Sequence, residues 1–521
     1  MNQNQLSVKP WKDAISSFFH PRVLTMLFLG FSAGVPSLII FSSLSLWLRE
    51  AGIERSAVTF FSWASLGYSF KFIWAPLIDR LPLPVLTSVL GRRRSWMLVS
   101  QIAVILSICF MAMIDPAGGE KMISLMFIGA LALGFSSATQ DIVIDAYRIE
   151  AACLELQGMM ASAYVAGYRI AMILAGAGAL FLADFFGSTK NIYIYDAWKW
   201  TYVIMAAAMV AGVITTLVIP EPEQNREKVL ADERMANIRF LFLFLFAVTG
   251  FILMFYYSGG LAGDMTFRLK QITGVDFISG FIVESLRLLL AIGAAFLVSE
   301  LCIRSGFVHR DVVGLNYVDP IRNFFERYGK GLALLLLCLV GLYRISDTVL
   351  GVIANVFYQD MGFTKTEIAA VSKTFGLVMT IIGGFVGGIL SIRYGVIKIL
   401  FLGALLSSVT NLLFMVLAGS GHDMAMLYWV ISADSLAGGI ASAAFIAFLS
   451  SMTDISFTAM QYALFSSLMT LIPKILGGYA GTMVDNLGYP AFFLITAVLG
   501  LPVLALVWLA GKHLALKEHR L

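Results

Sequence analysis

Residues 47–62, "WLREAGIERSAVTFFS", return as "FYQDMGFTKTEIAAVS" at residues 357–372, at a constant offset of 310 residues. The matched positions hold an aromatic residue, an acid, a glycine and two hydroxyl residues: Trp47 with Phe357, Glu50 with Asp360, Gly52 with Gly362, Ser56 with Thr366, and Ser62 with Ser372. Each copy connects the end of one long apolar run to the start of the next. Because a pattern that recurs at a fixed offset indicates an internal duplication, this stretch predicts a chain built of two similar halves.

The composition around these copies is that of a membrane protein. Of 521 residues, 59% are hydrophobic and only 13% are charged, whereas soluble domains carry about a quarter charged residues. Repeated apolar runs reach the length that a bilayer-spanning helix needs. We therefore expect an all-α integral membrane protein with 14 transmembrane helices, at residues 23–48, 57–79, 95–114, 122–146, 157–183, 200–219, 239–259, 277–303, 331–358, 366–391, 397–418, 424–450, 458–484 and 489–510.

The offset maps the first and second spans onto the ninth and tenth, which leaves the seventh and eighth as an inserted pair. Two halves of six helices plus this pair make up the expected domain organisation. Its boundaries are an interfacial N-terminus at 1–22, a first half at 23–219, a linker at 220–238, the inserted pair at 239–303, a second linker at 304–330, a second half at 331–510 and a tail at 511–521.

The distribution of basic residues predicts the orientation. With the N-terminus inside, most of the 36 Lys and Arg residues fall on the cytoplasmic side, as the positive-inside rule requires. Both termini are therefore expected in the cytoplasm. The net charge of +4 is spread over short loops, which does not indicate a nucleic-acid partner. The spacing of cysteines and histidines is not that of a metal site.

Two carboxylates follow an apolar run in "SSATQDIVIDAYRIE", residues 136–150. Asp141 and Asp145 are four residues apart, so a helix places them on one face, near the cytoplasmic end of the fourth span and near Arg148. Three roles are open: they act as gate residues that pair with basic groups, Asp141 carries a coupling proton, or they are ordinary polar residues of a helix end. Asp79, at the end of the second span, is expected beside them.

Further charges lie deep within predicted spans, where ionisable residues line cavities or pair with one another. Arg344 and Asp347 are three apart and are expected to neutralise each other, which also admits a purely structural ion pair. Because cations outnumber acids, the predicted cavity suits an anionic substrate. The predicted cavity residues are Lys71, Arg169, Arg344, Asp347, Asp434, Lys474, Gln140 and Tyr168.

Three stretches carry a family resemblance: "LGYSFKFIWAPLIDR" (66–80), "SSATQDIVIDAYR" (136–148) and "ASAYVAGYRIAMILAGAGAL" (161–180). Together they closely resemble the AmpG-type muropeptide permeases of the major facilitator superfamily. The loop "APLIDRLPLPVLTSVLGRRRSW" (75–96) resembles the loop signature of that superfamily but lacks its usual early glycine, with Ala75 and Pro76 in that place. The resemblance covers most of the chain, including the inserted pair.

The resemblance implies a bacterial inner-membrane importer of anhydromuropeptides for cell-wall recycling. It further implies a monomer in membrane lipid that uses the proton gradient as its energy source and needs no cofactor. A helix end of this pattern is also similar to acetyl-CoA transporters, so another bulky anion remains an alternative substrate. A membrane enzyme is disfavoured because the chain has five histidines, all at span ends or in loops, and shows no nucleophile–base pairing. A receptor or scaffold would leave the deep charges unexplained.

Overall fold

The computed structural model describes residues 19–53, 61, 68, 70–151, 154–189, 192–222, 231–273, 276–477 and 480–518, without the side chains of some helical residues such as Glu284 and Lys474. Within these ranges the chain is helical, and the one β-interaction is a single bridge between Thr189 and Ile192. Lipid offers no hydrogen bonds to a backbone, so apolar runs of this length satisfy their own N–H and C=O groups as helices. The prediction of an all-α protein is confirmed.

Eleven helices in the described ranges are long and apolar enough to cross a membrane. They occupy residues 21–38, 92–112, 120–151, 156–185, 195–218, 235–257, 330–354, 370–394, 396–420, 424–452 and 487–514. The expected span at 57–79 is only partly described, because residues 57–60, 62–67 and 69 lie outside the described residues, and its described end forms η4 (Lys71–Ile73) and most of α6 (Ala75–Arg80). The spans expected at 277–303 and 458–484 correspond to helices α16 (Asp276–Arg304) and α25 (Thr458–Gly477), which also include undescribed side chains.

The chain forms two compact units. The larger unit comprises residues 1–75, 82–224 and 324–521, and the smaller comprises 76–81 and 225–323. We call the part of the larger unit before residue 225 the N-half and the part from residue 324 the C-half.

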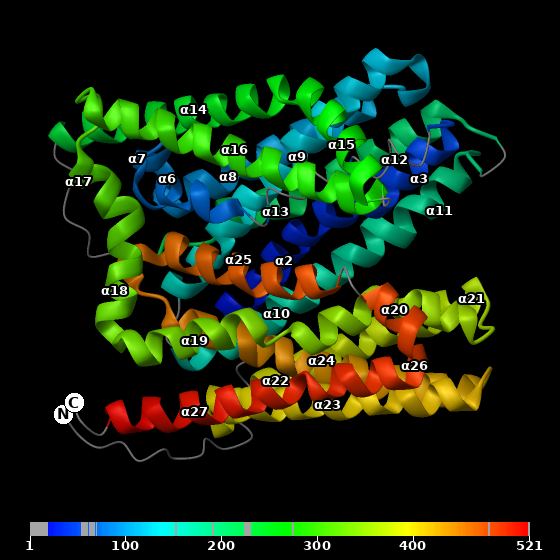
Figure 1. The fold of residues 1–521 in the computed structure, drawn as a ribbon. Helices are drawn as coiled ribbons and strands as arrows, with labels where there is room; N and C mark the ends of the chain where they lie inside the picture. Colours follow the sequence, from blue (N-terminus) through cyan, green and yellow to red (C-terminus); the bar gives the residue numbers. More distant parts are fainter. Residues whose placement is uncertain are drawn as a thin grey trace. The chain divides into compact units, whose positions relative to one another are not determined.

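The N-half is built of the helices labelled α2 to α13 in Figure 1. Short π and 3-10 turns interrupt them. Its elements are α2 (Pro21–Leu38), η2 (Ile39–Ser43), α3 (Leu44–Glu50), η4 (Lys71–Ile73), the start of α6 (Ala75–Arg80), α7 (Leu86–Leu90), α8 (Arg92–Ala112), η5 (Pro116–Gly118), α9 (Glu120–Ala151), α10 (Leu154–Ile173), η6 (Leu174–Gly178), α11 (Ala179–Phe185), α12 (Tyr195–Ala208) and α13 (Val210–Val218).

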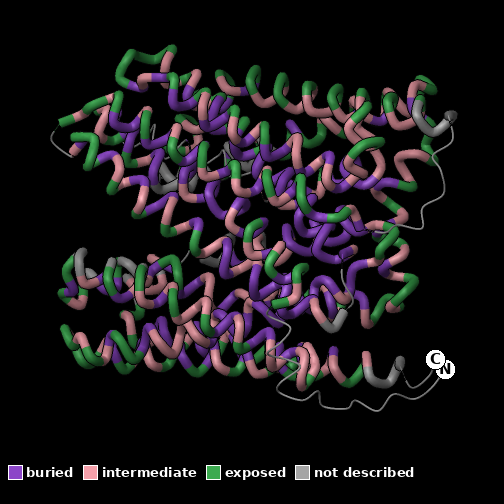
Figure 2. Tube along the Cα trace, turned by 180° about the vertical axis from the view of Figure 1, so that it is seen from behind, coloured by how far each residue is buried: buried purple, intermediate pink, exposed green. Residues whose placement is uncertain are grey.

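The C-half also consists of helices interrupted by short π and 3-10 turns. Its elements, after the end of α18 (Asp319–Tyr328), are α19 (Lys330–Leu342), α20 (Ile345–Asp360), α21 (Lys365–Ile368), η8 (Ala369–Phe375), α22 (Gly376–Tyr394), α23 (Val396–Ser420), α24 (Met424–Met452), η9 (Ile455–Phe457), α25 (Thr458–Gly477), α26 (Ala480–Val498) and α27 (Gly500–Glu518). Each half has its own hydrophobic core, and Ile149 of α9 is an N-half residue in the core of the C-half. Figure 2 shows the buried residues on the faces between helices and the exposed ones on the outer faces.

The smaller unit holds the inserted segment. Its elements are α14 (Ala231–Tyr257), α15 (Gly259–Thr273), α16 (Asp276–Arg304), α17 (Arg310–Val313), η7 (Gly314–Val318) and the start of α18 (Asp319–Tyr328). The sequence predicts two helices and a polar linker here. The structure adds α15 as a third helix, and helical turns occupy most of residues 310–328.

Left-handed glycines recur in the two halves at matching places. Gly52 and Gly362 have φ of 83° and 87°, a conformation that side chains with a Cβ rarely adopt. Both follow the acid of the repeated sequence, so the duplication seen in the sequence is also present in the backbone. Three further pairs occupy corresponding connections: Gly91 with Gly395, Gly119 with Gly421, and Gly187 with Gly488.

Candidate functional site

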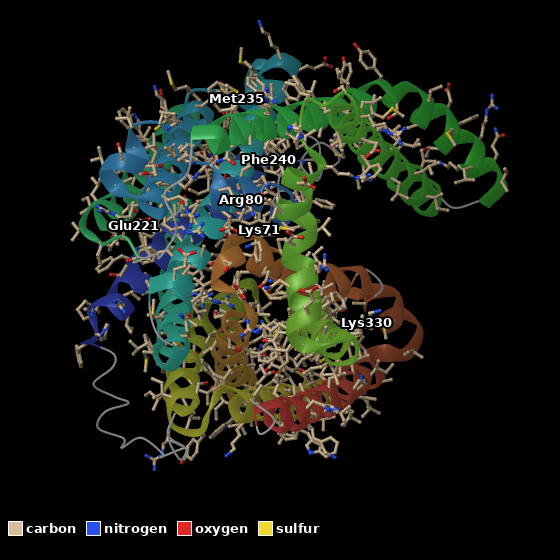
Figure 3. The ribbon with its side chains drawn as sticks, turned by 90° about the vertical axis from the view of Figure 1, so that its left-hand side faces the viewer. Lys71, Arg80, Glu221, Met235, Phe240 and Lys330 are labelled. Atoms are coloured by element: carbon tan, nitrogen blue, oxygen red, sulfur yellow. The ribbon has the colours of Figure 1, made fainter. Side chains whose placement is uncertain are left out.

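Helix α9 brings three of the predicted site residues onto one face. Asp141, Asp145 and Arg148 follow one another at spacings of four and three residues, which stacks them along a helix. Asp145 is buried between two cations: Lys71 Nζ lies 3.7 Å from its Oδ2, and Arg148 Nη2 lies 3.3 Å from its Oδ1. Figure 3 labels Lys71, which η4 carries beside α25. The expected pairing of these acids with basic groups is therefore present for Asp145.

Arg148 also reaches into the other half. Its side chain is completely buried, and its Nη1 donates to Ser450 Oγ of α24 at 2.6 Å and to Gln157 Oε1 at 3.3 Å. Its guanidinium lies 5.1 Å from the ring centroid of Tyr462 on α25. A single cation thus connects α9 of the N-half with two helices of the C-half. Neither Ser450 nor Tyr462 carries a signal in the sequence that identifies it as a partner.

Asp141 has a different environment. Its Oδ1 is buried and accepts no hydrogen bond from the described part of the chain, and the charges that act on it are those of Lys71 and Asp145. An ionised carboxylate is costly to bury without donors, and protonation removes that cost. Four tyrosines lie close enough to interact with it electrostatically: Tyr68, Tyr164, Tyr168 and Tyr462.

Polar and aromatic groups continue from this acid along α9 and α10. Gln140 Nε2 donates to Ser32 Oγ at 3.0 Å, while its Oε1 is buried without a donor in the described residues. The rings of Tyr164 and Tyr168 have centroids 6.1 Å apart. Aromatic faces and hydroxyl groups of this kind suit a sugar ring. Gln140 is completely buried, and the role of Gln140 and Tyr168 in lining a substrate cavity stays a prediction.

A second charged group lies in the C-half. Arg344 occupies a break between α19 and α20, donates from Nη1 to Ser442 Oγ at 2.7 Å, and lies 3.8 Å from Asp347 Oδ2. The predicted ion pair is confirmed. Asp434 of α24 accepts from Thr410 Oγ1 at 3.4 Å and interacts electrostatically with both members of the pair. Breaks in transmembrane helices typically mark the binding sites of transporters.

Arg169 of α10 connects the two groups. Its guanidinium is close enough to Arg344 for the two positive charges to interact, although they belong to different halves. Its one hydrogen bond in the described residues runs from Nη1 to the sulfur of Met172 at 3.9 Å. Because α10 packs against α24, to which Arg344 binds through Ser442, the structure brings these cations of the two halves into the same interior region of the larger unit.

Two predicted residues do not join these groups. Asp79 is buried in α6, but it belongs to the smaller unit, so its predicted place beside Asp141 stays a prediction. Lys474 lies in α25, and its side chain is outside the described residues. Groups of acids, cysteines and histidines that could hold a metal ion do not occur among the residues that the structure describes.

The end of the larger unit where α8 begins carries a network that the sequence analysis missed. We call it the basic end. Arg93 binds Glu150 through Nε at 2.9 Å and Nη2 at 2.5 Å, a buried two-pronged pair. Glu221, labelled in Figure 3, accepts from the backbone N–H groups of Arg93 and Arg94 at 2.8 and 3.1 Å. Glu150 and the arginine cluster are both visible in the sequence, but only folding reveals their pairing.

The opposite end, where α3 ends, repeats one bracing arrangement in each half. Glu50 Oε2 accepts from Trp198 Nε1 and Ser188 Oγ, each at 2.7 Å. Asp360, its partner in the repeat, accepts from the hydroxyl of Tyr489. In both halves, an acid that ends an early helix thus accepts a hydrogen bond from an aromatic residue of a late helix: Glu50 from Trp198 and Asp360 from Tyr489.

Two groups near this end, outside the spans, have shifted pKa values. Burial, followed by a hydrogen bond to Asp115, raises the pKa of the Tyr193 hydroxyl. Hydrogen bonds from the Thr364 backbone and from His422 hold the pKa of Glu367 below its ordinary value. Glu367 Oε2 lies 3.1 Å from His422 Nε2, which ties the start of α21 to the loop before α24.

In the described residues, the hydrogen bonds between the halves lie toward the basic end. Besides the Arg148–Ser450 bond, Ser162 Oγ donates to the carbonyl of Gly384 at 2.6 Å. A Cβ on Gly158 would lie 3.2 Å from Ser391, so α10 and α22 approach closely there. The interior charges around Asp141 and Arg344 lie between this closed contact and the end formed by Glu50 and Asp360.

Comparison with known proteins gives the same architecture. The family model described as Major Facilitator Superfamily matches residues 57–310 and 336–519. A transporter named AmpG 4 of Rickettsia felis is 29% identical over 94% of this chain and 97% of its own length. The anhydromuropeptide permease of Escherichia coli K12 is 27% identical over 95% of this chain and 81% of its own.

Solved structures agree in fold. The transporter FucP in its outward conformation aligns with a TM-score of 0.59 at 11% identity, covering 95% of this chain and 99% of its own. The proton:xylose symporter XylE aligns with a TM-score of 0.56 at 13% identity, covering 95% and 96%.

Proposed function

The chain belongs to the Major Facilitator Superfamily, and from this premise we propose that it imports anhydromuropeptides across the bacterial inner membrane by alternating access. The observation that carries the proposal is the similarity to a permease for such molecules along nearly the full length of both chains. A mixed interior of cations, tyrosines and amides supports it, because the substrate combines sugar rings with peptide carboxylates.

The proposed orientation has the basic end and both termini in the cytoplasm, since basic residues concentrate on that side of membrane proteins. The contacts of Arg148 and Ser162 with the C-half then close the cytoplasmic side. A single copy, with its two halves, is the proposed transport unit in the lipid. The proton gradient is the proposed energy source, without a cofactor.

Asp141 is the proposed proton carrier. Arg148 is the proposed cytoplasmic latch, by which we mean the residue whose bond to Ser450 holds the cytoplasmic side closed. With Asp141 ionised, Lys71 interacts with two carboxylates, Asp141 and Asp145. When a proton neutralises Asp141, Lys71 turns to Asp145 alone and competes with Arg148 for it. Arg148 then loses part of the charge that positions its bond to Ser450, and the cytoplasmic contact opens.

Uptake by proteoliposomes tests this function. A labelled anhydro-disaccharide peptide is supplied outside, with the outer solution either more acidic than the lumen or at the same pH. We expect acid-stimulated uptake by the wild type and uptake without stimulation by Asp141→Asn, because the amide cannot carry the proton.

Asp196→Asn, an exposed change on α12, is the matched control and is expected to keep the stimulation. If Asp141→Asn keeps the acid stimulation, the proposed import function stands, but Asp141 is not the residue that carries the proton. If folded wild-type protein takes up no muropeptide but takes up acetyl-CoA, the proposed substrate is wrong.

A further inference from the structure

We propose that Arg169 and Arg344 form a carboxylate clamp, with one guanidinium from each half, that binds a peptide carboxylate of the substrate and draws the halves together around it. The inference rests on the proposed function and assigns one part of its substrate to one pair of residues. It also gives the substrate's charge a role in the transport cycle.

Arg169 is a cation without an acid. It is half-buried on α10, and the described part of the chain places no carboxylate within ion-pairing distance of it. Among the described residues, Arg344, a like charge, and the neutral Tyr168 interact with it electrostatically. Burial of a cation in this setting is unfavourable, so Arg169 has unused capacity to bind an anion.

Arg344 has guanidinium donors beyond the one that its own partners contact. Ser442 and Asp347 both contact Nη1, and among the described residues Nε and Nη2 have no hydrogen-bond partner. Its side chain is 28% exposed, so a ligand can reach it. Because a guanidinium offers donors in a planar fork, Arg344 can keep its internal contacts and still hold an oxygen of a carboxylate.

The acids nearby do not neutralise both arginines. Asp347 pairs with Arg344 at 3.8 Å, and Asp434 interacts with these two residues. Both acids lie on the C-half, whereas the positive charge of Arg169 lies on the N-half. Tyr168 and Tyr343 are the other titratable groups beside the pair. The site is therefore most positive on the side of Arg169.

Two like charges on opposite halves oppose closure of the space between them. A carboxylate that binds both replaces this repulsion by two charge-assisted contacts. Since a ligand shifts a conformational equilibrium only through its differential affinity for the two states, a carboxylate favours the closed form and an uncharged ligand does not. The clamp thus couples recognition of the peptide to movement of the halves.

The test compares two probes that differ only in charge: an anhydro-disaccharide tetrapeptide with free peptide carboxylates, and the same molecule with these groups converted to carboxamides. Uptake is measured for both at several concentrations. We expect the wild type to prefer the carboxylate form by at least about tenfold in uptake efficiency, because a hydrogen bond to a charged group contributes on the order of one power of ten or more.

Arg169→Gln and Arg344→Gln are each expected to reduce this preference by about tenfold, through loss of uptake of the carboxylate form alone. Arg169→Lys keeps the charge without the fork, so it is expected to retain an intermediate preference. Lys199→Gln, which removes a half-exposed cation of α12, is the matched control and should leave the preference unchanged.

Uptake of the carboxamide probe shows that each variant is folded and active. An unchanged preference in both glutamine variants would overturn the clamp while leaving the importer in place. A wild type that takes up both probes equally well would overturn it too. Failure of the wild type to take up either probe contradicts the proposed function itself, which distinguishes the two results.

Discussion

Replacement of Ser450 by alanine should weaken the connection between the halves at the basic end. The change removes the hydroxyl that accepts from Arg148 Nη1 at 2.6 Å and leaves the hydrogen bonds of Arg148 to Asp145 and Gln157 in place. A hydrogen bond to a charged group contributes about 1.5 to 3 kcal/mol. Because this bond exists only while the halves touch, its loss should shift the equilibrium toward the form open at the basic end by about one to two powers of ten.

Pulsed electron–electron resonance between two spin labels measures the shift. Val89→Cys on α7 and Lys398→Cys on α23 place one label on each half at exposed positions of the basic end, in a background without the native cysteines. We expect the Ser450→Ala protein to show a longer-distance population that the parent lacks or holds as a minor component.

Ser451→Ala is the control, because the Ser451 hydroxyl donates within its own helix to the carbonyl of Phe448 at 2.7 Å. It should leave the distance distribution unchanged. Identical distributions for Ser450→Ala, Ser451→Ala and the parent would refute the idea that Arg148 holds the halves together.

Three further predictions concern stability. Glu50→Gln replaces the carboxylate that binds Trp198, so it should cost about 1 to 3 kcal/mol and lower the melting temperature read from tryptophan fluorescence. Gly167→Ala places a Cβ 1.9 Å from the carbonyl oxygen of Leu27. This overpacking should cost about 1 to 3 kcal/mol of stability and lower the same melting temperature. Gly351→Ala is the control and should leave it unchanged, because a Cβ at Gly351 meets no atom within 4 Å. The folded state lowers the pKa of Glu367 from its ordinary 4.5. The ionised Glu367 therefore stabilises the fold above pH 4.5, and this stabilisation is lost as the pH falls through the pKa of the folded state. Hydrogen exchange at the start of α21 should accelerate below about pH 4.5 in the wild type but not in Glu367→Gln.

Local features of the site were accessible from the sequence. Arg344 and Asp347 are three residues apart on one chain segment, and they form the predicted pair. The face of α9 that carries Asp141 and Asp145 follows from helical spacing in the same way. Such features depend on backbone geometry that neighbouring residues share, and tertiary packing does not alter them.

Contacts between distant residues were not accessible. Arg148 and Ser450 are 302 residues apart, and Arg93 and Glu150 are 57 apart. An apolar run gives the depth of a residue in the membrane but not the direction in which its helix faces a neighbour, because lipid-exposed and buried faces are both apolar. The sequence therefore predicts that Arg169 and Arg344 are deep but not that they oppose each other.

The amino-acid sequence by itself determined that this is a helical membrane protein of two related halves, since the length of apolar runs and the repeat of an acid before a left-handed glycine are properties of single segments. Only the tertiary structure decided which charges meet. The latch at Arg148 and the facing arginines depend on how α9 and α10 pack against α22, α24 and α25, and that packing is the joint result of side chains from both halves.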